Sequence, residues 1–434
     1  MVNVSMGLKL LLLLSVISVL LYILFIEYFT IYDTAVNKLK YSIQLNHKGN
    51  SSNELSKHLN KIEKKKYTNE EIENMSNLGK LLFLAANGTY PPASQRSNKY
   101  LILVWQYGSY LERRHLRRFS SKMYSPWLDC SVECQLSYNS RDLKKADAVL
   151  FHLHRMKNRQ QMPRRMHLLQ RWVFLTDESP LHTFLYGNQE LTDYNGLFNW
   201  SMSYRSDSDV PVPYGRTIDR QVDVDLTEFY DMFKKKNNLV AIMGSNCGGS
   251  NGRWNYVKHL KNLLGDHLDI YGHCLQGNIN ACPGHFDNDC TVLESYKFYL
   301  AFENSNCKEY LTEKTFWHGY HKWAVPIIMG AAQSECEKLL PPKSYLHVED
   351  FASPAVLATY LLYLHRHDDE YFTFHQWRRH YKVINEHGYF GSASKHYCRL
   401  CEALHYNSPK AKTYQNLEQF WSKEKDCTLV AWNR

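Results

Sequence analysis

Three features are missing from this sequence of 434 residues, and each absence removes a class of protein. The first is a continuous basic block, because the lysines and arginines stand in short clusters at 113–118, 164–165 and 234–236. No nucleic-acid-binding motif accompanies these clusters, so we expect no nucleic acid partner. The net charge of +9 instead fits a sugar nucleotide or the anionic face of a membrane.

The second missing feature is a signal-peptide cleavage site. The apolar run from Leu8 to Ile26, interrupted only by Lys9, is followed by Glu27-Tyr-Phe-Thr-Ile-Tyr32, which lacks the small residues that cleavage needs. A run of this length just spans a bilayer core, so we predict an uncleaved transmembrane signal anchor over 8–26 after a cytoplasmic tail over 1–7. The polar composition of residues 27–97 predicts a weakly ordered stem.

The third missing feature is a second Cys-x-x-Cys, and its absence disfavours a zinc site at Cys398-Arg-Leu-Cys401. All eleven cysteines follow residue 129, and glycosylation sequons stand at Asn50, Asn74, Asn87 and Asn199. Both facts favour a luminal, oxidising compartment in which disulfides persist. An odd number leaves at least one thiol free or paired with another chain. A redox role for the Cys-x-x-Cys motif is a distant alternative.

From Tyr100 onward, short apolar runs alternate with polar segments, which is typical of a parallel sheet with helices outside. One series comprises 101–105, 148–152 and 172–176, and a second begins at 239–243 and 268–271. An irregular stretch over about 205–238 joins them. The chain is therefore predicted to be α/β, with two Rossmann-like domains facing a central cleft, over 98–222 and 223–402. Residues 403–434 are a predicted C-terminal extension, and the final helices, with Trp377, Tyr381 and Trp421, are expected to pack back across the domains.

The segment 294–330 is a predicted βαβ unit. Phe298, Leu300 and Phe302 alternate with the other face of a strand, and a return strand runs over 324–329. Between them, Thr312 is the expected N-cap of a helix with Lys314 in its first turn. A lysine beside free amides at the carboxyl end of a parallel strand suits a phosphate-bearing ligand, although a solvated lysine has even odds on spacing alone.

Two further loops follow predicted strands. Thr176-Asp-Glu-Ser-Pro180 places a carboxylate, either Asp177 or Glu178, where ligands bind in open α/β sheets, with helix capping as the alternative. The glycine-rich loop from Ser245 leads to Arg253 in a first helical turn, where arginine can bind a phosphate through two parallel hydrogen bonds. Taken alone, this loop is weak support for a phosphate site.

Other acidic and histidine pairs are interpreted as structural. The triplets at 207–209 and 223–225 could suggest a metal-binding Asp-x-Asp, but the second resembles an ordinary alternating strand or linker. Because Arg253 and Lys314 can neutralise a diphosphate, a divalent ion is not required and no metal site is predicted. Four histidines at strand or helix spacing are expected to be packing or surface residues: His152, His154, His318 and His321.

Three ordered motifs carry a family resemblance. Phe302-Glu-Asn-Ser305, Tyr310-Leu-Thr-Glu-Lys314, and Trp323-Ala-Val-Pro326 with Gly330 resemble the donor-site signature of the α1,3-fucosyltransferases, glycosyltransferase family 10. Glu178-Ser-Pro180 is similar to the family's general-base motif, and 197–209 and 212–215 extend the match. The resemblance covers approximately residues 98–402.

The resemblance implies an inverting, metal-independent transfer of L-fucose from GDP-fucose, in α1,3 linkage, to a GlcNAc residue of a glycoprotein or glycolipid glycan. Glu178 would be the general base and contact the acceptor, in the acceptor-side domain 98–222. No cofactor is required besides the donor substrate. The residues implied in donor binding are Tyr214 of domain 98–222 and ten residues of domain 223–402: Met243, Ser245, Asn246, Arg253, Asn280, Tyr299, Asn304, Tyr310, Glu313 and Lys314.

Departures from the family pattern keep some points open. Met243 and Asn280 do not match its usual residue types, and Ser109, implied in acceptor binding, stands where relatives that act on lactosamine often carry glutamine. The acceptor therefore stays open between a lactosamine antenna, the N-glycan core and a LacdiNAc-like unit. Cys130 and Cys134 resemble the family's amino-terminal cysteines, which implies bridges to Cys398 and Cys401.

The resemblance also implies a Golgi location, as a single-pass type II membrane glycoprotein whose catalytic part is luminal. The expected partners are GDP-fucose, a GlcNAc-containing glycan and the Golgi membrane, and homodimerisation is left open. The alternative function is a membrane-anchored glycan-binding protein or inactive homologue without turnover. A binding module needs no base and diphosphate clamp together, so the whole set argues against it: Glu178, Arg253, Asn304, Glu313 and Lys314.

Overall fold

The computed structural model describes residues 61–85, 98–118, 122–187, 189–282, 289–389, 392–428 and 432. The predicted tail and signal anchor, and the sequons at Asn50 and Asn87, lie outside these ranges. Over the part of the chain that is described, no helix is both long and apolar enough to cross a membrane.

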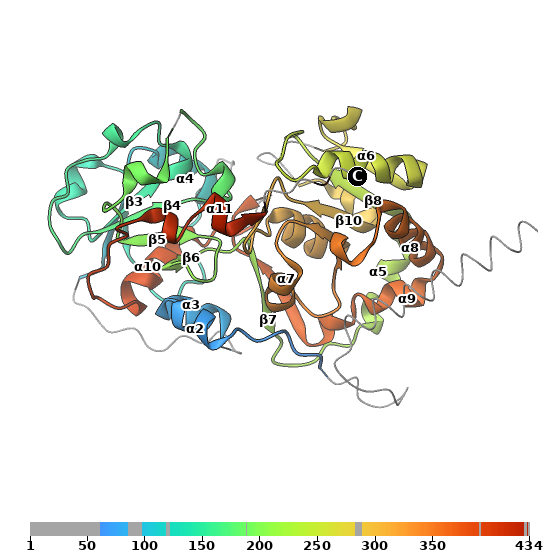
Figure 1. Cartoon of the computed structure of the whole chain (residues 1–434). Helices are drawn as coiled ribbons and strands as arrows, with labels where there is room; N and C mark the ends of the chain where they lie inside the picture. The colour runs from blue at the N-terminus through green and yellow to red at the C-terminus, as the bar shows by residue number, and fades with distance from the viewer. Residues whose placement is uncertain are drawn as a thin grey trace, which may run out of the picture. The chain divides into compact units, whose positions relative to one another are not determined.

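The first domain is built on a six-stranded parallel sheet, with α4 (Gly108–His115) beside it (Figure 1). The two central strands, β3 and β4, are buried along their whole length, because parallel strands are covered on both faces. This explains why they read as continuous apolar runs in the sequence. In spatial order the strands are β2 (Gln135–Ser137), β1 (Leu101–Val104), β3 (Ala148–His152), β4 (Arg171–Leu175), β5 (Trp200–Ser203) and β6 (Val210–Pro211).

The second domain has a five-stranded parallel sheet with a switch in strand order. From β8 the chain moves to one side through β9, and then to the other through β10 and β12. Ligands bind at the carboxyl ends of strands at such a switch point, here between β8 and β10. In spatial order the strands are β13 (Leu346–His347), β12 (Val325–Met329), β10 (Tyr296–Phe302), β8 (Asn238–Met243) and β9 (Leu268–Tyr271).

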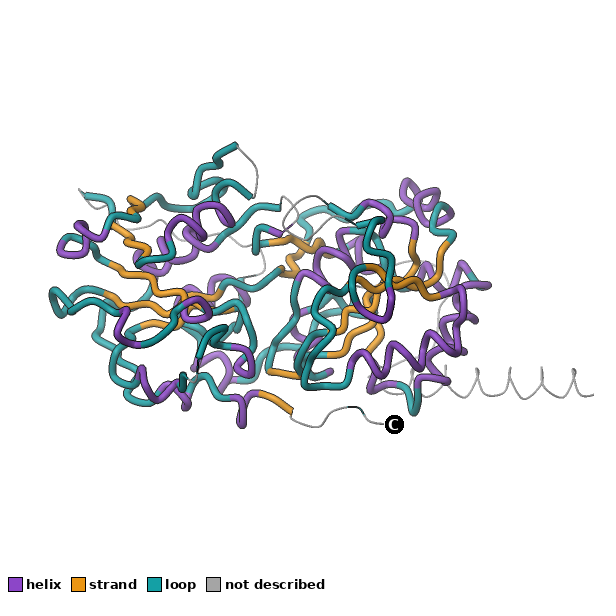
Figure 2. The backbone as a smooth tube through the Cα atoms, turned by 90° about the horizontal axis from the view of Figure 1, so that it is seen from above, coloured by secondary structure: helices purple, strands orange, loops and turns teal. Residues whose placement is uncertain are grey.

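Helices and loops enclose the strands of both sheets (Figure 2). The other α-helices are α2 (Asn69–Asn74), α3 (Asn77–Phe83), α5 (Tyr230–Lys234), α6 (Arg253–Leu264), α7 (Gln333–Leu339), α8 (Pro354–Arg366), α9 (Asp368–Thr373), α10 (His396–Tyr406) and α11 (Lys423–Asp426), and η10 (Lys314–His321) is a π-helix. The short 3₁₀ helices are η1 (Ser140–Lys144), η2 (Leu153–Arg155), η3 (Arg159–Gln161), η4 (Pro180–His182), η5 (Leu191–Tyr194), η6 (Thr227–Phe229), η7 (Gly265–His267), η8 (Cys274–Gln276), η9 (Thr291–Ser295), η11 (Val348–Asp350), η12 (Gln376–Arg379) and η14 (Leu417–Gln419).

The chain returns to the first domain earlier than predicted. β7 (Gly215–Asp219) leaves that domain and pairs antiparallel with β14 (Tyr381–Asn385), which comes back from the second. Helix α10 then packs into the first domain's core through Tyr397, Leu400 and Cys401. The predicted second domain, 223–402, is therefore wrong at its carboxyl end, because the apolar face of α10 is buried under β1, β5 and β6.

The predicted stem is also corrected over residues 61–85. Leu78 and Leu82 of α3 are buried in the same core as α10, and α3 lies beside β6 and α10 (Figure 1). The Leu78 amide donates to the Asn407 side chain at 2.9 Å, and the Lys65 amide donates to the Glu337 carbonyl at 3.0 Å. Polar composition predicted weak order, but a few buried leucines are enough to fix the segment.

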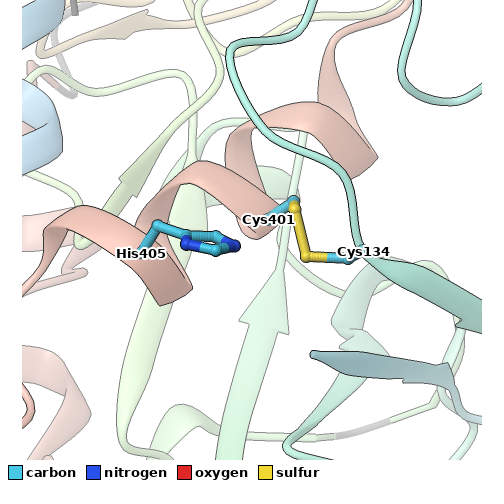
Figure 3. Close-up of side chains that lie close together, drawn as sticks. All are labelled: Cys134, Cys401 and His405. Carbon is cyan, nitrogen blue, oxygen red and sulfur yellow. A yellow bond between two sulfur atoms is a disulfide. The ribbon is translucent and has the colours of Figure 1, made fainter. Parts of the chain in front are cut away.

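Five disulfides use ten of the eleven cysteines, and Cys336 is a buried free thiol. Two bridges, Cys130–Cys398 and Cys134–Cys401, have the pairing that the resemblance implies. Figure 3 shows His405 one helical turn after Cys401, so the three side chains resemble a metal-ligand set. Both sulfurs are joined to each other, however, and offer no thiolate. The bridges not foreseen are Cys247–Cys274, Cys282–Cys290 and Cys307–Cys427.

The sequon at Asn199 is buried and fully used in hydrogen bonds. Its side-chain oxygen accepts from Arg165 and from the Trp172 amide, each at 2.8 Å, and its side-chain nitrogen donates to the Lys412 carbonyl at 2.8 Å. Only 5% of the residue is exposed. A glycan on that nitrogen is incompatible with this fold, which overturns Asn199 as a glycosylation candidate, whereas Asn74 is exposed at the end of α2.

Peptide mapping of the folded protein is therefore expected to find Asn199 unmodified. Asn199→Ala should lower the free energy of unfolding by about 1–3 kcal/mol, because it leaves buried donors and acceptors without partners. Asn74→Ala, at an exposed sequon, should change it by less than about 0.5 kcal/mol. Thermal or denaturant unfolding measures both. A glycan on Asn199 in correctly folded protein would contradict the buried geometry.

Candidate active site

A pocket of about 320 Å³ is lined by residues of both domains. Eleven of the predicted site residues line it: Glu178, Tyr214, Met243, Ser245, Asn246, Arg253, Tyr299, Asn304, Tyr310, Glu313 and Lys314. Two do not. Ser109 is exposed on α4, and Asn280 is exposed in a turn closed by the Asn278 side chain, although its neighbour Ile279 lines the pocket. The set expected from the motifs is therefore largely in one place.

The ambiguity between the two acids after β4 is resolved by their surroundings. Asp177 is only 4% exposed, forms an ion pair with Arg114 at 3.0 Å and contacts His396 at 3.0 Å. Burial alone would raise the pKa of Asp177, but the charges of Arg114 and His387 outweigh it and hold that pKa well below its usual range. Asp177 is thus a structural anion, and Glu178 is the acid that lines the pocket.

Glu178 is held from the second domain by a tyrosine. The Tyr310 hydroxyl donates to Glu178 Oε2 at 3.0 Å. Burial, followed by the negative charge of Glu178, raises the pKa of Tyr310 well above its usual value, so the phenol keeps its proton and acts as a donor. The carboxylate keeps further lone pairs for a second donor, such as a substrate hydroxyl.

A second tyrosine forms the pocket wall beside the buried acid. Tyr214 stacks on His387 with ring centroids 3.7 Å apart, and its hydroxyl donates to the Asp177 carbonyl at 2.9 Å. On the second domain, the Tyr299 hydroxyl accepts from the Met243 amide at 3.2 Å. Both rings are almost fully buried, so they are fixed parts of the wall.

Lys314 lies opposite, at the start of η10. Its ammonium contacts Glu303 at 3.0 Å and Glu313 at 3.1 Å. Burial alone would lower the pKa of Lys314, but these two carboxylates raise it above its usual value. For Glu313, burial is outweighed by the charge of Lys314, which lowers its pKa to about 2. The amine is therefore a permanent cation, which a negatively charged ligand can share.

The helix begins later than predicted. Glu313, not Thr312, is its N-cap. The amide and hydroxyl of Thr312 both donate to Glu303 Oε1 at 2.8 Å, and this binds Thr312 to the end of β10 instead. Lys314 consequently starts the helix, with its amide 3.5 Å from the Thr312 hydroxyl oxygen.

Arg253 is the first residue of α6 and closes the glycine-rich loop. Its guanidinium donates to the carbonyls of Asn246 at 2.7 Å, Phe302 at 3.0 Å and Gly248 at 3.2 Å. Burial lowers the pKa of Arg253, and the charge of Glu303 opposes this shift only in part. Because a guanidinium has five N–H donors, two remain for a phosphate. The loop also bonds to the strand end, since the Ser250 amide donates to the Asn304 carbonyl at 2.9 Å.

Sequence reasoning missed several pocket residues. His318 was interpreted as packing, yet it lines the pocket one helical turn after Lys314, a spacing that puts both on one helix face. Tyr389 lines the wall next to Tyr214, from which it is distant in sequence. The remaining wall comes from loops bound by the bridges Cys247–Cys274 and Cys282–Cys290, which no local pattern reveals.

The chain matches two family models over most of its described domains. One is described as "Fucosyltransferase, N-terminal" and matches residues 97–215; the other is described as "Glycosyltransferase family 10 (fucosyltransferase) C-term" and matches residues 233–421. The chain belongs to glycosyltransferase family 10. The family expected from the motifs is thereby confirmed.

Known members of family 10 are similar over much of this chain. Glycoprotein 3-alpha-L-fucosyltransferase A of Drosophila melanogaster is 34% identical over 312 residues, which are 70% of this chain and 57% of the relative. A 4-galactosyl-N-acetylglucosaminide 3-alpha-L-fucosyltransferase of Gorilla gorilla gorilla is 35% identical over 261 residues, which are 58% and 67%. A crystal structure of an alpha1,3-fucosyltransferase with GDP-fucose aligns at 16% identity and a TM-score of 0.45, covering 78% of this chain and 99% of that one. The chain spans little more than half of the fruit-fly relative's own length.

The acidic triplets of this family 10 chain have structural roles or lie outside the pocket lining. Asp207 is paired with Arg205 at 2.5 Å and Lys308 at 2.8 Å, and Asp209 accepts from Ser201 and Tyr414. Neither triplet contributes to the pocket lining. The interpretation of 207–209 as structural agrees with these contacts.

His318 predicts a pH dependence of stability. Burial, opposed by the charge of Glu313, lowers the pKa of His318 to about 3, so the folded chain keeps it neutral at pH 5. The unfolded chain takes up the proton near pH 6.5. Because the unfolded state binds more protons between these values, the free energy of unfolding should fall as pH falls, by about 2 kcal/mol from pH 7 to pH 5.

The measurement compares denaturant unfolding of wild type and His318→Asn between pH 7 and pH 5. The variant should show a shallower pH dependence, by about one proton taken up on unfolding. His167→Asn, which removes an exposed histidine in the first domain, should keep the wild-type slope. Equal slopes for wild type and His318→Asn would contradict a buried neutral imidazole.

Proposed function

We propose that this family 10 chain transfers L-fucose from GDP-fucose, in α1,3 linkage, to a GlcNAc residue of a glycoprotein or glycolipid glycan, with inversion and without a metal. One observation carries the proposal. A single pocket holds one carboxylate of the first domain, Glu178, together with two cations of the second, Arg253 and Lys314. A general base and a diphosphate clamp are the two things such a transfer needs.

Glu178 is the proposed general base. A sugar hydroxyl is a weak nucleophile at neutral pH, and proton removal in the transition state contributes about 10²–10⁴-fold to the rate. Tyr310 fixes one carboxylate oxygen, which orients the other toward the incoming hydroxyl. The 3-hydroxyl of GlcNAc attacks the anomeric carbon on the face opposite GDP, and its proton passes to Glu178, so the configuration inverts.

Arg253 and Lys314 are proposed to stabilise the departing diphosphate. Both line the pocket, and each is the first residue of a helix, Arg253 of α6 and Lys314 of η10. Free backbone amides and the helix dipole favour anions at such positions. Lys314 is now balanced by Glu303 and Glu313, and a diphosphate would share its charge. Two cations suffice to offset a diphosphate, so the proposal includes no divalent ion, and the disulfides leave no thiolate for one at Cys134 and Cys401.

The acceptor, location and assembly are proposed more coarsely. Ser109 is exposed on α4 and lies outside the pocket lining, so we propose that it contacts a part of the acceptor glycan other than the reacting hydroxyl. The proposal includes a GT-B cleft and a Golgi-anchored type II arrangement with a luminal catalytic part. The disulfides support the luminal, oxidising compartment. An acceptor panel with labelled GDP-fucose distinguishes lactosamine, N-glycan core and LacdiNAc-like substrates.

Glu178→Gln is expected to abolish transfer while GDP still binds, because the amide keeps the side chain's shape but cannot accept the proton. Turnover should fall by at least about 10²-fold. Glu133→Gln, which neutralises an exposed carboxylate of the first domain, should retain wild-type turnover. If Glu178→Gln turned over like wild type, another base would be required. If wild-type chain bound GDP without transfer to any acceptor, the glycan-binding alternative would stand.

Lys314→Ala is expected to weaken GDP binding by about 10–100-fold, the value of a charge-assisted hydrogen bond of about 1.5–3 kcal/mol. Calorimetric titration with GDP measures this without an acceptor. Lys258→Ala removes the same charge from an exposed position of α6 and should leave the affinity within about twofold. Equal losses in both variants would indicate a general charge effect and would remove Lys314 from the diphosphate clamp.

A further inference from the structure

The last part of the chain returns from the first domain to the second beside the pocket. We call residues 420–428 together with Trp432 the C-terminal strap. Trp421 is fully buried, and its indole donates to Thr183 Oγ1 at 2.9 Å, just after the Glu178 loop. Asp426 contacts both domains, because its carboxylate pairs with Arg205 at 2.9 Å while its carbonyl accepts from the Lys308 amide at 2.6 Å. The family model ends at residue 421, before most of this strap.

The strap is joined covalently to the strand that follows Asn304. β15 (Cys427–Thr428) pairs antiparallel with β11 (Asn306–Cys307), and a disulfide joins Cys307 to Cys427. Between Asn304 and β11, the Ser305 hydroxyl donates to Ser179 Oγ at 2.7 Å, next to Glu178. The bridge therefore fixes the segment that connects the base loop with the donor side of the pocket.

Trp432 contacts the glycine-rich loop. Its amide donates to the Asn251 carbonyl at 2.9 Å, and its ring packs against Tyr256 and His259 of α6, with centroids 4.8 and 5.1 Å away. The Asn251 side chain donates in turn to the Glu303 carbonyl at 2.9 Å and to Asn306 Oδ1 at 2.8 Å. Contacts of Asn251 and Trp432 thus connect the glycine-rich loop, the end of β10 and helix α6.

The backbone of Trp432 lies very close to Gly252 of the glycine-rich loop. The Gly252 φ of 72° lies in the left-handed region, and a Cβ added there would collide with the Trp432 carbonyl oxygen. Gly252 is the N-cap of α6, so the residue after it is Arg253. The backbone immediately before the diphosphate-binding arginine is therefore shaped to accept Trp432.

We propose that Trp432 and the Cys307–Cys427 disulfide are positioning residues of the donor site, which hold Arg253 and Asn304 at the spacing that a nucleoside diphosphate requires. This inference rests on the proposed function. The strap touches neither the sugar nor the reacting atoms in this assignment. It acts by ordering the loop before the ligand arrives, which lowers the entropy cost of binding.

The test compares Trp432→Ala with wild type as otherwise unaltered chains with intact disulfides. GDP affinity, measured by calorimetry, should fall about tenfold, which corresponds to about 1.4 kcal/mol. The KM for GDP-fucose should rise similarly, whereas kcat at saturating donor and the KM for the acceptor should stay within about twofold, because the base is untouched. Trp432→Phe should restore most of the affinity, since a ring again packs on Tyr256.

A second variant tests the covalent part. Cys307→Ser/Cys427→Ser removes the bridge without leaving an unpaired thiol, and it should weaken GDP binding in the same selective way. Lys425→Ala, which changes an exposed side chain of the strap, should bind GDP like wild type. Thermal unfolding run in parallel shows whether each variant is folded at the assay temperature.

Hydrogen exchange separates failure of this inference from failure of the proposed function. Amides of 249–253 and 304–307 should exchange faster in Trp432→Ala than in wild type, with or without GDP. If wild type binds GDP and Trp432→Ala binds it equally well, the positioning role is overturned. If wild type binds no GDP, the proposed function fails, and the exchange result alone then decides whether the strap orders the loop: unchanged rates overturn the inference, and faster rates support it.

Discussion

The ion pair between Asp177 and Arg114 determines how the rest of the site is arranged. Burial of a lone carboxylate is costly, so Asp177 must remain beside Arg114 and the histidine at 396. Because Asp177 is buried in the interior, its neighbour Glu178 is the acid that lines the pocket. There the Tyr310 hydroxyl of the second domain donates a hydrogen bond to it. The buried charge of Asp177 therefore explains why Glu178 is the acid in the pocket and why it is available for contact with the second domain.

On the side of the pocket that the second domain forms, the two cations already have partners. Lys314 is paired with two carboxylates, and Arg253 is bonded to three carbonyls. These ion pairs and hydrogen bonds fix the positions of both side chains. The two domains are joined by similar contacts, since the Ser206 amide and hydroxyl both donate to Glu309 at 2.6 Å. Polar contacts therefore both join the two domains and hold the charged side chains of the pocket.

Local patterns predicted what local physics controls. The buried strands were found because parallel strands need apolar residues on both faces, and Lys314 and Arg253 were found because they follow strands at helix starts. Residues 61–85 were misjudged, because their polar composition hides the few leucines that pack under the first sheet. Asn199 was misjudged for a related reason: a sequon is a three-residue pattern, whereas burial of its amide depends on Arg165 and on a carbonyl more than two hundred residues away.

The sequence by itself determined the family, the alternation of strands and helices, and most of the residues that line the pocket, because these follow from short motifs and from hydrophobic spacing. Only the tertiary structure decided which of two adjacent acids faces the pocket, that α10 belongs to the first domain, and that the C-terminal strap crosses to the glycine-rich loop. Each of these depends on contacts between residues far apart in the chain. Such contacts form only when buried charges and apolar faces have partners in the folded molecule. Because each partner depends on the positions of the others, a local stretch of sequence does not determine them.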